Sequence, residues 1–327
     1  MIANCAKMDS IDPKRIEQQD EISFRTAIII LNFNRAKDTI NLCAGIIENL
    51  SSNYSVIVVD NCSDDENELV DYVNLKNGFV TNLHEGFEEV NNRLFLINAV
   101  NNLGYAKGNN LGLRMARSMG FSRAFIVNPD VIITDYNVFE SLNSIISSSE
   151  KKLAIIGPEL ILPDGSKQLP YKFRPDYRMA IFNFLYPLSS AVIKYLHHLQ
   201  VENFGYHDVY LVIGCFFCMD LNVFSLCGYF DESTFLYYEE AIIAERIKRI
   251  GYNIGYAPHF SVIHNHVYSS EWEKKTCKLM NTSREFYQSV YLKTSRIENA
   301  FVEVSSAYQK VLHSLIKLLR RSVGNNA

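Results

Sequence analysis

The sequence has no long uncharged apolar run. Its nearest approach is the stretch 179–193, which contains Asn183 and Pro187 and is bounded by Arg178 and Lys194. A membrane-spanning helix needs ~18 or more consecutive apolar residues, so none is predicted here. No signal-peptide pattern opens the chain either. We therefore expect a cytoplasmic protein, either soluble or bound peripherally at the inner face of the cytoplasmic membrane.

Excess charge of one sign is also lacking, and so are cysteine pairs at zinc spacing. The net charge is −4, which offers no general attraction for nucleic acid, so no nucleic-acid partner is expected. The seven cysteines are an odd number, typical of reduced thiols in a cytoplasm. Cys215 and Cys218 form one CxxC pair with no second pair, and they lie in the apolar run Val209–Met219. This pair is predicted to belong to the core.

The chain does contain short apolar runs that alternate with segments of helical spacing. With 327 residues, 48% of them hydrophobic and 21% charged, it is long enough for a large globular core. Four runs predict buried strands: Thr26–Leu31, Ser55–Val59, Leu94–Ile97 and Phe125–Val127. Alternation of strands and helices predicts βαβ units and a parallel sheet.

The fourth strand is interrupted by Asn128-Pro129-Asp130. Proline cannot donate to a strand ladder, so the strand is expected to end there, with the Asp130 carboxylate at the carboxyl edge of the sheet. Open α/β sheets bind their ligands at this edge, and a carboxylate there suits Mg²⁺ or Mn²⁺ shared with substrate phosphates. The alternative is that Asp130 caps a helix that begins near Asp135.

Polar residues end three of the four predicted strands, and a parallel sheet would gather them at one edge. They are Asn32–Asn34, Asp60-Asn61 and Asn128–Asp130. Asp60 is placed to accept hydrogen bonds from a nucleobase or ribose, and Lys107 in a glycine-bearing loop could meet a phosphate. The turn after the first strand has no glycine, which argues against a dinucleotide site. Ser63 and Glu66 fit a capping box for the helix that follows the second strand.

Taken in order, these motifs resemble the family 2 glycosyltransferases. The matching pieces are Asn32-Phe33-Asn34, Val58-Val59-Asp60-Asn61-Cys62-Ser63, Asn102-Leu103-Gly104-Tyr105-Ala106-Lys107-Gly108-Asn109-Asn110, Asn128-Pro129-Asp130, Gly228-Tyr229-Phe230-Asp231-Glu232, Tyr238-Glu239-Glu240, Arg246–Tyr252 and Val262-Ile263-His264. The pattern looks most like the rhamnosyltransferase-like branch that builds bacterial O-antigens and capsules, and it covers about Thr26 to Leu292. The resemblance implies an α/β protein with the GT-A nucleotide-sugar-binding fold, a mostly parallel central sheet with helices on both faces, and a C-terminal helical appendage.

The resemblance also implies roles for individual residues. The nucleotide-sugar-binding residues would be Asn32, Asn34, Asp60, Asn102, Gly104, Lys107, Asn109, Asn128 and His264. Asp130 and His264 would bind a divalent cation, Mg²⁺ or Mn²⁺, with Asn128 in place of the first acid of the family's DxD motif. Glu240 stands where the family has its catalytic base, with Glu239 before it. Ile242 replaces an acid that is common in this helix.

The two glutamates can also be judged from chemistry alone. Inverting sugar transfer needs a base for the acceptor hydroxyl while charge builds on the departing nucleoside diphosphate. Glu240 lies at the start of the predicted helix Glu239–Ile250, where the helix dipole favours an ionised carboxylate. The structural alternative is that both residues are ordinary first-turn acids, which are common.

Three regions are expected along the chain: an N-terminal extension (1–24), a GT-A domain (25–268) with an insertion at about 171–206, and a C-terminal helical region (269–327). The insertion is expected to cover the acceptor or face a membrane. The last segment combines apolar residues with Lys310, Lys317, Arg320 and Arg321. A basic amphipathic helix of this kind suits an anionic membrane surface, and packing on the globule is the alternative.

The sequence therefore predicts an inverting, metal-dependent glycosyltransferase of surface polysaccharide biosynthesis. Its donor would be a nucleotide sugar, dTDP-rhamnose or a UDP-hexose, and its acceptor a polysaccharide or lipid-linked oligosaccharide. Two alternatives stay open: a sugar-phosphate nucleotidyltransferase, which would need a basic glycine-rich loop after the first strand, and an inactive nucleotide-sugar-binding or assembly protein.

Overall fold

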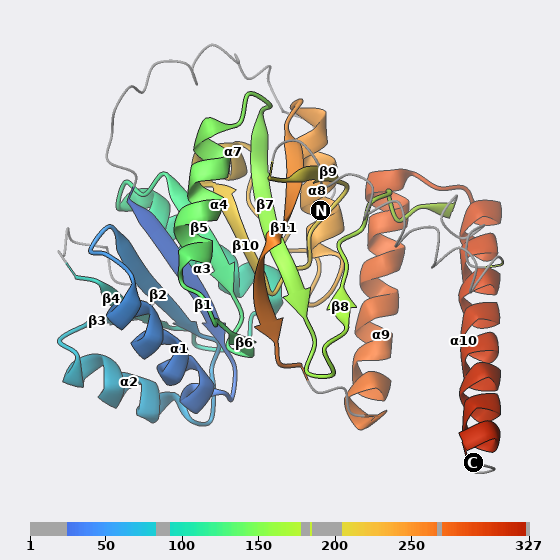
Figure 1. The fold of residues 1–327 in the computed structure, drawn as a ribbon, viewed down its shortest axis with the longest axis horizontal. Coiled ribbons are helices and arrows are strands. Elements are labelled where there is room, and N and C mark those ends of the chain that lie inside the picture. Colours follow the sequence, from blue (N-terminus) through green and yellow to red (C-terminus); the bar gives the residue numbers. More distant parts are fainter. Residues whose placement is uncertain (1–24, 83–91, 178–183, 185–204, 267–269, 325–327) are drawn as a thin grey trace.

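One large mixed sheet forms the centre of the protein (Figure 1). The computed structural model describes residues 25–82, 92–177, 184, 205–266 and 270–324. The strand order is β3-β4-β2-β1-β5-β10-β7-β11-β6, and β8 pairs with β7 and β9 with β11. The strands are β1 (Thr26–Asn32), β2 (Tyr54–Asp60), β3 (Phe79–Asn82), β4 (Leu94–Asn98), β5 (Arg123–Val127), β6 (Val131–Ile132), β7 (Leu153–Ile161), β8 (Lys167–Gln168), β9 (His207–Val209), β10 (Phe216–Asp220) and β11 (Asn253–His264).

Helices cover both faces of this sheet. They are α1 (Ala36–Asn49), α2 (Glu66–Leu75), α3 (Gly104–Ser118), α4 (Asn137–Ser148), α7 (Leu221–Leu226), α8 (Glu239–Arg249), α9 (Ser270–Phe286), the π-helix η2 (Tyr287–Leu292) and α10 (Arg296–Gly324). Successive residues of a strand point to opposite faces, and β1 shows the consequence. Ile29 packs in one core with residues of α3 and α8, whereas Ile28 packs in a second core with residues of α1 and α4.

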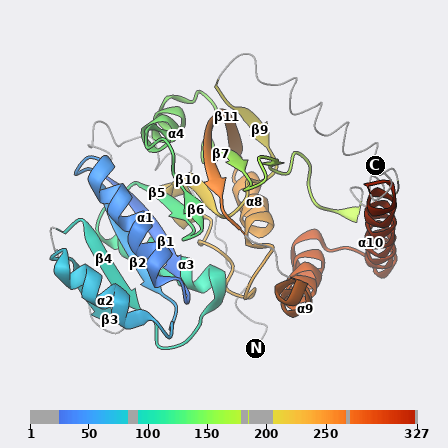
Figure 2. The same ribbon diagram turned by 60° about the horizontal axis from the view of Figure 1, so that its bottom comes forward.

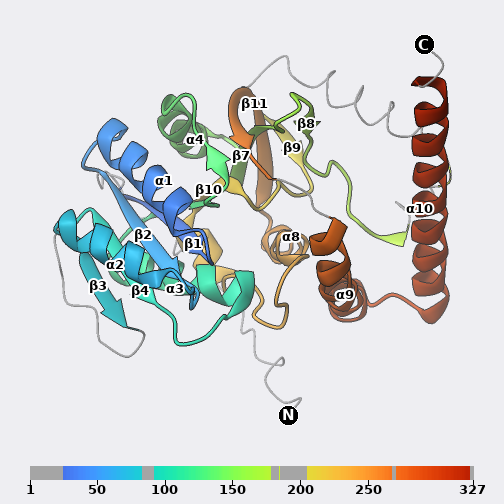
Figure 3. The same ribbon diagram turned by 90° about the horizontal axis from the view of Figure 1, so that it is seen from below.

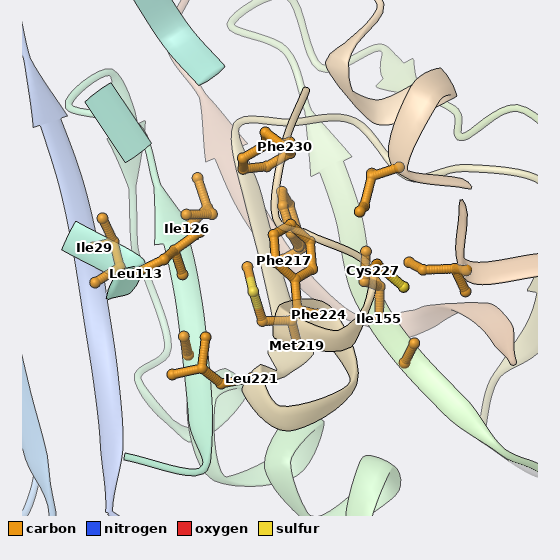
Figure 4. Packing of buried hydrophobic residues seen from close by; sticks show 14 of the residues in the cluster. Ile29, Leu113, Ile126, Ile155, Phe217, Met219, Leu221, Phe224, Cys227 and Phe230 are labelled. Atoms are coloured by element: carbon orange, nitrogen blue, oxygen red, sulfur yellow. The ribbon is translucent and has the colours of Figure 1, made fainter. Parts of the chain in front are cut away.

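The core on the α3 and α8 face is filled by side chains from distant parts of the chain. Figure 4 shows Leu113 of α3 beside Ile29 and Ile126, and Phe217 near Phe224 of α7. Each of these side chains is at most 1% exposed. Burial of a large apolar side chain contributes about 1.5–3 kcal/mol, so this core fixes the sheet on which the polar strand ends are mounted.

The first part of the sheet is parallel, as predicted. β1 pairs in parallel with β2 and with β5, and β2 pairs in parallel with β4. β10 is antiparallel to both β5 and β7, which makes the sheet mixed beyond β5. Cys215 and Cys218 are both buried, in agreement with their predicted place in the core. The four-residue edge strand β3 was not predicted, because its sequence is too short to show a clear alternation.

One predicted capping box is wrong. Helix α2 begins at Glu66 with Asp65 as its N-cap residue, and Ser63 lies before it. The Ser63 hydroxyl is already engaged, since it accepts hydrogen bonds from the Asn34 backbone N–H and the Asn32 side-chain amide at 2.9 and 3.0 Å. The tertiary contact with the end of β1 takes the place of the local cap.

After β11 the chain continues in helices that stand beside the sheet. Helix α9 passes into η2, and a left-handed residue, Lys293 (φ 52°), precedes α10. Figures 1, 2 and 3 all show α10 at the edge of the molecule, beyond α9 as seen from the sheet. Most of the predicted insertion at 171–206 lies outside the described residues. Among the helices of the described ranges, none has the length and apolar character that a bilayer span requires.

Candidate active site

The ends of β1 and β2 form a buried polar cluster. Asn32 and Asp60 are paired in the parallel register and are both fully buried. The Asn32 amide donates to Asp60 Oδ1 (2.8 Å), and the Ser63 backbone N–H donates to Asp60 Oδ2 (2.9 Å). Asn32 Oδ1 accepts from the Thr39 hydroxyl at 2.7 Å. Asp60 therefore has both carboxylate oxygens engaged within the protein, where it braces the loops that follow the two strands.

The predicted Asn34, Asn102 and Gly104 lie in loops around this cluster. Asn34 adopts a left-handed conformation (φ 53°), and its Oδ1 accepts from the Asp64 backbone N–H at 2.8 Å. Asn102 Oδ1 accepts from Asn61 and from the Gly104 backbone N–H, both at 2.9 Å. Gly104 has φ 77°, and a Cβ there would collide with the Phe235 carbonyl, so only glycine fits the start of α3.

The predicted α3 residues divide between solvent and core. Lys107 is exposed on the first turns of α3, so its amine is free to meet a ligand in solution. Asn109 is fully buried and donates to the Tyr105 carbonyl at 3.0 Å, while its Oδ1 has no hydrogen-bond partner in the described part of the chain. The structure thus does not gather Lys107 and Asn109 on the same surface.

Asp130 follows β5 and lies beside the end of β11. It does not cap α4, because that helix begins at Asn137 and Asp135 accepts from the Asn137 N–H. Asp130 Oδ2 is 3.2 Å from His266 Nδ1 and 3.2 Å from Arg35 Nη1. Asp130 Oδ1 is 3.7 Å from His264 Nε2 and has no hydrogen-bond partner among the described residues.

Asp130, His264 and His266 could hold a metal ion. One ligand atom from each lies within 4.8 Å of the others, and the two imidazole rings stack with centroids 5.4 Å apart. Gln168 Oε1 lies 2.8 Å from His264 Nδ1, which leaves His264 Nε2 facing Asp130. Carboxylate oxygens suit Mg²⁺ and Mn²⁺, and imidazole nitrogens are common ligands of transition metals. The orphaned Asp130 oxygen and the oriented His264 nitrogen therefore fit a divalent cation.

The pKa values of Asp130 and His264 favour the binding of a cation. Burial raises the pKa of Asp130, but the hydrogen bond with His266 and the nearby Arg35 guanidinium act in the opposite direction, and the net pKa is lowered. Burial lowers the pKa of His264. A carboxylate that stays ionised beside an imidazole that stays neutral is the protonation state that metal binding needs.

Glu239 and Glu240 open α8 after an unusual turn. Tyr237 and Tyr238 both have positive φ angles (75° and 69°), which are rare for bulky residues and cluster at functional sites. Glu239 is buried, and its Oε1 has no hydrogen-bond partner within the described ranges. Gly214 lies against the other carboxylate, because a Cβ on Gly214 would collide with Glu240 Oε1.

The two carboxyl groups have different environments. Burial, followed by repulsion from Glu240, raises the pKa of Glu239 well above its usual value. Burial also raises the pKa of Glu240, but hydrogen bonds from its own backbone N–H and from that of Gly214 oppose the rise. Glu239 therefore has the more strongly raised pKa of the pair, and Glu240 is the more readily ionised member. A difference of this kind separates an acid from a base in many active sites.

Both carboxylate groups line one cleft of about 640 Å³. Two groups of polar residues line it. One is Asn128, Asp130, His264 and His266, and the other is Glu239 and Glu240 of α8. Leu31, Phe33, Tyr171, Leu211, Leu236 and Met280 add apolar surface. Phe33 and Tyr171 are about half exposed, so two aromatic faces are available to a ligand in this cleft.

The structure places several residues here that the predicted set of site residues did not include. His266 joins the candidate metal group, and the alternating His264-Asn265-His266 pattern was the available signal. Arg35 contacts Asp130 across 95 positions of sequence, and Gln168 contacts His264 across 96. No local pattern marks contacts between such distant residues. Conversely, the structure places Asn32, Asp60 and Asn109 in the interior, and Lys107 and Asn34 at the surface.

Comparison with known proteins agrees with this geometry. No protein-family model matches the chain. It is 27% identical over 240 residues to the low-salt glycan biosynthesis hexosyltransferase Agl10 of Haloferax volcanii, a match that covers 73% of this chain and 66% of the relative. The chain thus spans slightly less than two thirds of that relative's length.

Two solved structures share the fold. The mannosyltransferase PcManGT from Pyrobaculum calidifontis, solved with GDP-Man and Mn²⁺, superposes with a TM-score of 0.54 at 11% identity and covers 92% of this chain and 79% of that chain. GalNAc-T7, solved with UDP, GalNAc and Mn²⁺, superposes with a TM-score of 0.53 at 15% identity, covering 88% of this chain and 55% of that chain. The predicted GT-A fold is confirmed. The chain is thus similar in sequence to a hexosyltransferase and similar in fold to two glycosyltransferase structures.

Proposed function

We propose that this protein is a metal-dependent glycosyltransferase that moves a sugar from a nucleotide-sugar donor to a carbohydrate acceptor with inversion at the anomeric carbon. The observation that supports this most directly is the placement of two kinds of buried carboxylate in one cleft. Asp130 lies with two imidazoles, and Glu240 lies on α8 beside Glu239, whose pKa is raised well above its usual value. A leaving group and a nucleophile need these two kinds of environment in the same cavity.

On the donor side, Asp130, His264 and His266 would hold the divalent cation. When bound, that cation supplies positive charge for the diphosphate of the donor. Arg35 lies against Asp130 and is partly exposed, so its guanidinium is available to phosphate oxygens. Asn128 lines the same cleft as an uncharged neighbour of Asp130. Asn32, Asp60 and Asn102 are proposed to shape the loops that receive the nucleoside.

On the acceptor side, Glu240 would serve as the base. As the acceptor oxygen forms its bond to the anomeric carbon, the bond from that carbon to the diphosphate oxygen breaks. The acceptor's hydroxyl proton passes to Glu240, which the Gly214 N–H helps to keep ionised before the reaction. Glu239, with its raised pKa, limits the negative charge in the pocket to one carboxylate.

The proposal also covers the donor and the acceptor. The donor would be dTDP-rhamnose or a UDP-hexose, and the acceptor a polysaccharide or lipid-linked oligosaccharide of a bacterial surface-polysaccharide pathway. The motif order in the sequence supports the rhamnosyltransferase-like branch, and the exposed rings of Phe33 and Tyr171 offer stacking faces for sugars or bases. A cytoplasmic location at the inner membrane face follows from the same proposal.

The test measures the release of nucleoside diphosphate from a panel of nucleotide sugars with Mn²⁺, Mg²⁺ or EDTA. We expect turnover with a narrow set of donors and its loss in EDTA. If the protein instead forms a nucleotide sugar from a sugar phosphate and a nucleoside triphosphate, it is a nucleotidyltransferase. Donor binding without turnover under any of these conditions, with acceptor glycans present, would identify an inactive binding protein.

A further inference from the structure

Helix α10 carries an apolar stripe that stays largely exposed within the described part of the chain. Ile297, Val304, Val311 and Leu315 are 83, 60, 60 and 51% exposed, and Phe301 and Tyr308 are 37 and 40% exposed. These six positions follow one another at steps of four, three, four, three and four residues, and Leu318 continues the series in the sequence. A four-three alternation is the heptad spacing of a coiled-coil seam.

A second side of the same helix is less exposed. Ser305 is fully buried, and Val302 and Leu312 are half-buried. Phe184 packs against the boundary between the two sides, with ring centroids 5.5 Å from Phe301 and 5.2 Å from Tyr308. Phe184 therefore covers part of Phe301 and Tyr308, whereas Ile297, Val304, Val311 and Leu315 remain more than half exposed.

The helix is also well suited to project this stripe. A capping box fixes its start, because the Ser295 N–H donates to Glu298 Oε2 (2.7 Å) and the Glu298 N–H donates to Ser295 Oγ (3.3 Å). Its 29 residues span about 43 Å at 1.5 Å per residue, long enough for three heptads. All three ribbon views place α10 at the periphery.

We propose that the exposed stripe of α10 is a dimerisation seam that pairs antiparallel with α10 of a second copy of this chain. In the register that matches apolar positions, Ile297 meets the partner's Leu315, Phe301 meets the partner's Val311, and Val304 meets the partner's Tyr308. A two-fold axis relates these contacts, so each is made twice, as in most homodimers.

The charge distribution along the helix sets the orientation. Its first half carries Glu298 and Glu303 against one basic residue, Arg296, whereas Lys310, Lys317, Arg320 and Arg321 all fall in its second half. An antiparallel pair places the acidic half of each helix beside the basic half of its partner and also aligns the helix dipoles favourably. A parallel pair would set the basic halves against each other.

Small residues beside the stripe support close approach. Ala300 and Ala307 are exposed, lie seven residues apart and flank the stripe on its outer side. In the antiparallel register the two copies of Ala307 meet near the two-fold axis, where no bulky side chain holds the helices apart. An anionic membrane is the competing occupant. A membrane-binding helix gains from basic residues along its length, but Glu298 and Glu303 flank Phe301 in the first half of the stripe.

The test compares the full chain with V304E/V311E by sedimentation velocity over a range of micromolar concentrations. We expect the native protein at twice the chain mass of 37.5 kDa and the variant at the single-chain mass, with unchanged circular dichroism. The control L75E/V290E places the same charges on two exposed apolar residues away from the stripe and should keep the dimer. If V304E/V311E misfolds, V304S/V311S replaces it.

The antiparallel orientation of the two helices is tested separately, by disulfide cross-linking. Chains with I297C and chains with L315C are mixed and oxidised, and a disulfide between the two variants is expected in excess over disulfides within each variant. A native protein of single-chain mass, or a dimer that survives V304E/V311E, would overturn the proposal. Salt-sensitive binding to phosphatidylglycerol vesicles that V304E/V311E abolishes would instead assign the stripe to a membrane.

Discussion

Two polar clusters lie at the same edge of the sheet, and they differ in how their buried atoms are satisfied. Around Asn32 and Asp60, both Asp60 oxygens, the Asn32 amide and the Ser63 hydroxyl have partners within the protein. In the cleft, Asp130 Oδ1 and Glu239 Oε1 are buried without a hydrogen-bond partner in the described part of the chain. A buried polar group without a partner carries a desolvation cost, so evolution retains it chiefly where a ligand or reaction uses it.

This difference separates a scaffold from a reactive site. The Asn32–Asp60 cluster holds two loops together through complete hydrogen bonding, and its loss should act on stability. The Asp130 and Glu239–Glu240 groups lie on an open cavity, and their loss should act on turnover. Four substitutions test that separation.

The largest effect is expected from Glu240→Gln. The amide keeps the shape of the side chain and cannot accept the acceptor's proton, so transfer should fall about 10²–10⁴-fold, the range for loss of a general base. Donor binding, measured by calorimetry, should stay close to that of the native protein. Glu239→Gln is the matched control and should reduce turnover far less. A Glu240→Gln protein that loses donor affinity, beside a Glu239→Gln protein that loses only turnover, would reverse the two roles.

Asp130→Asn should lower activity about 10²-fold or more, because the cation's several kcal/mol of charge stabilisation depends on this carboxylate. The Mn²⁺ dependence of donor binding should weaken in parallel, while the thermal melt stays unchanged. Asp135→Asn provides the control, since Asp135 is an exposed acid five residues along that caps α4. Native turnover of a folded Asp130→Asn protein at saturating donor would contradict the metal assignment.

Asp60→Asn should act on stability. The amide presents donors where Asp60 now accepts from the Asn32 amide and the Ser63 N–H, so about 1–3 kcal/mol should be lost. For a domain of this size the melting temperature falls roughly 2–4 °C per kcal/mol. Differential scanning calorimetry with and without donor checks this. An unchanged melt together with a large loss of donor affinity would make Asp60 a direct nucleoside ligand, as the sequence resemblance implies.

The smallest effect concerns the pH dependence of stability through Glu239. Its folded-state pKa is raised by burial, so ionisation is less favourable in the folded protein than in the unfolded chain. The cost is absent below the unfolded pKa of about 4.3 and grows as the pH rises, until it is complete above the raised folded pKa. Glu239→Gln should remove this cost and raise the melting temperature at pH 8 more than at pH 5. Melts in EDTA measure it, and equal shifts at both pH values would contradict the raised pKa.

The sequence alone determined much of the fold and part of the site. Continuous apolar runs are typical of strands that are buried on both faces of a sheet. Four such runs form strands here: Thr26–Leu31, Ser55–Val59, Leu94–Ile97 and Phe125–Val127. Asn128-Pro129-Asp130 ends β5 because proline cannot continue a ladder. The first-turn placement of Glu239 and Glu240 on α8 also followed from local pattern.

Only the tertiary structure decided which of these polar residues face the cleft. Asp60 and Asp130 both follow buried strands, and nothing local distinguishes them. Asp60 meets Asn32 and the Ser63 N–H, whereas Asp130 meets two histidines from β11 and the residues just beyond it, and keeps one oxygen free of hydrogen bonds within the described ranges. The difference arises from partners about 30 residues away in one case and more than 130 in the other. Contacts over such separations depend on strand order, which local propensity does not encode.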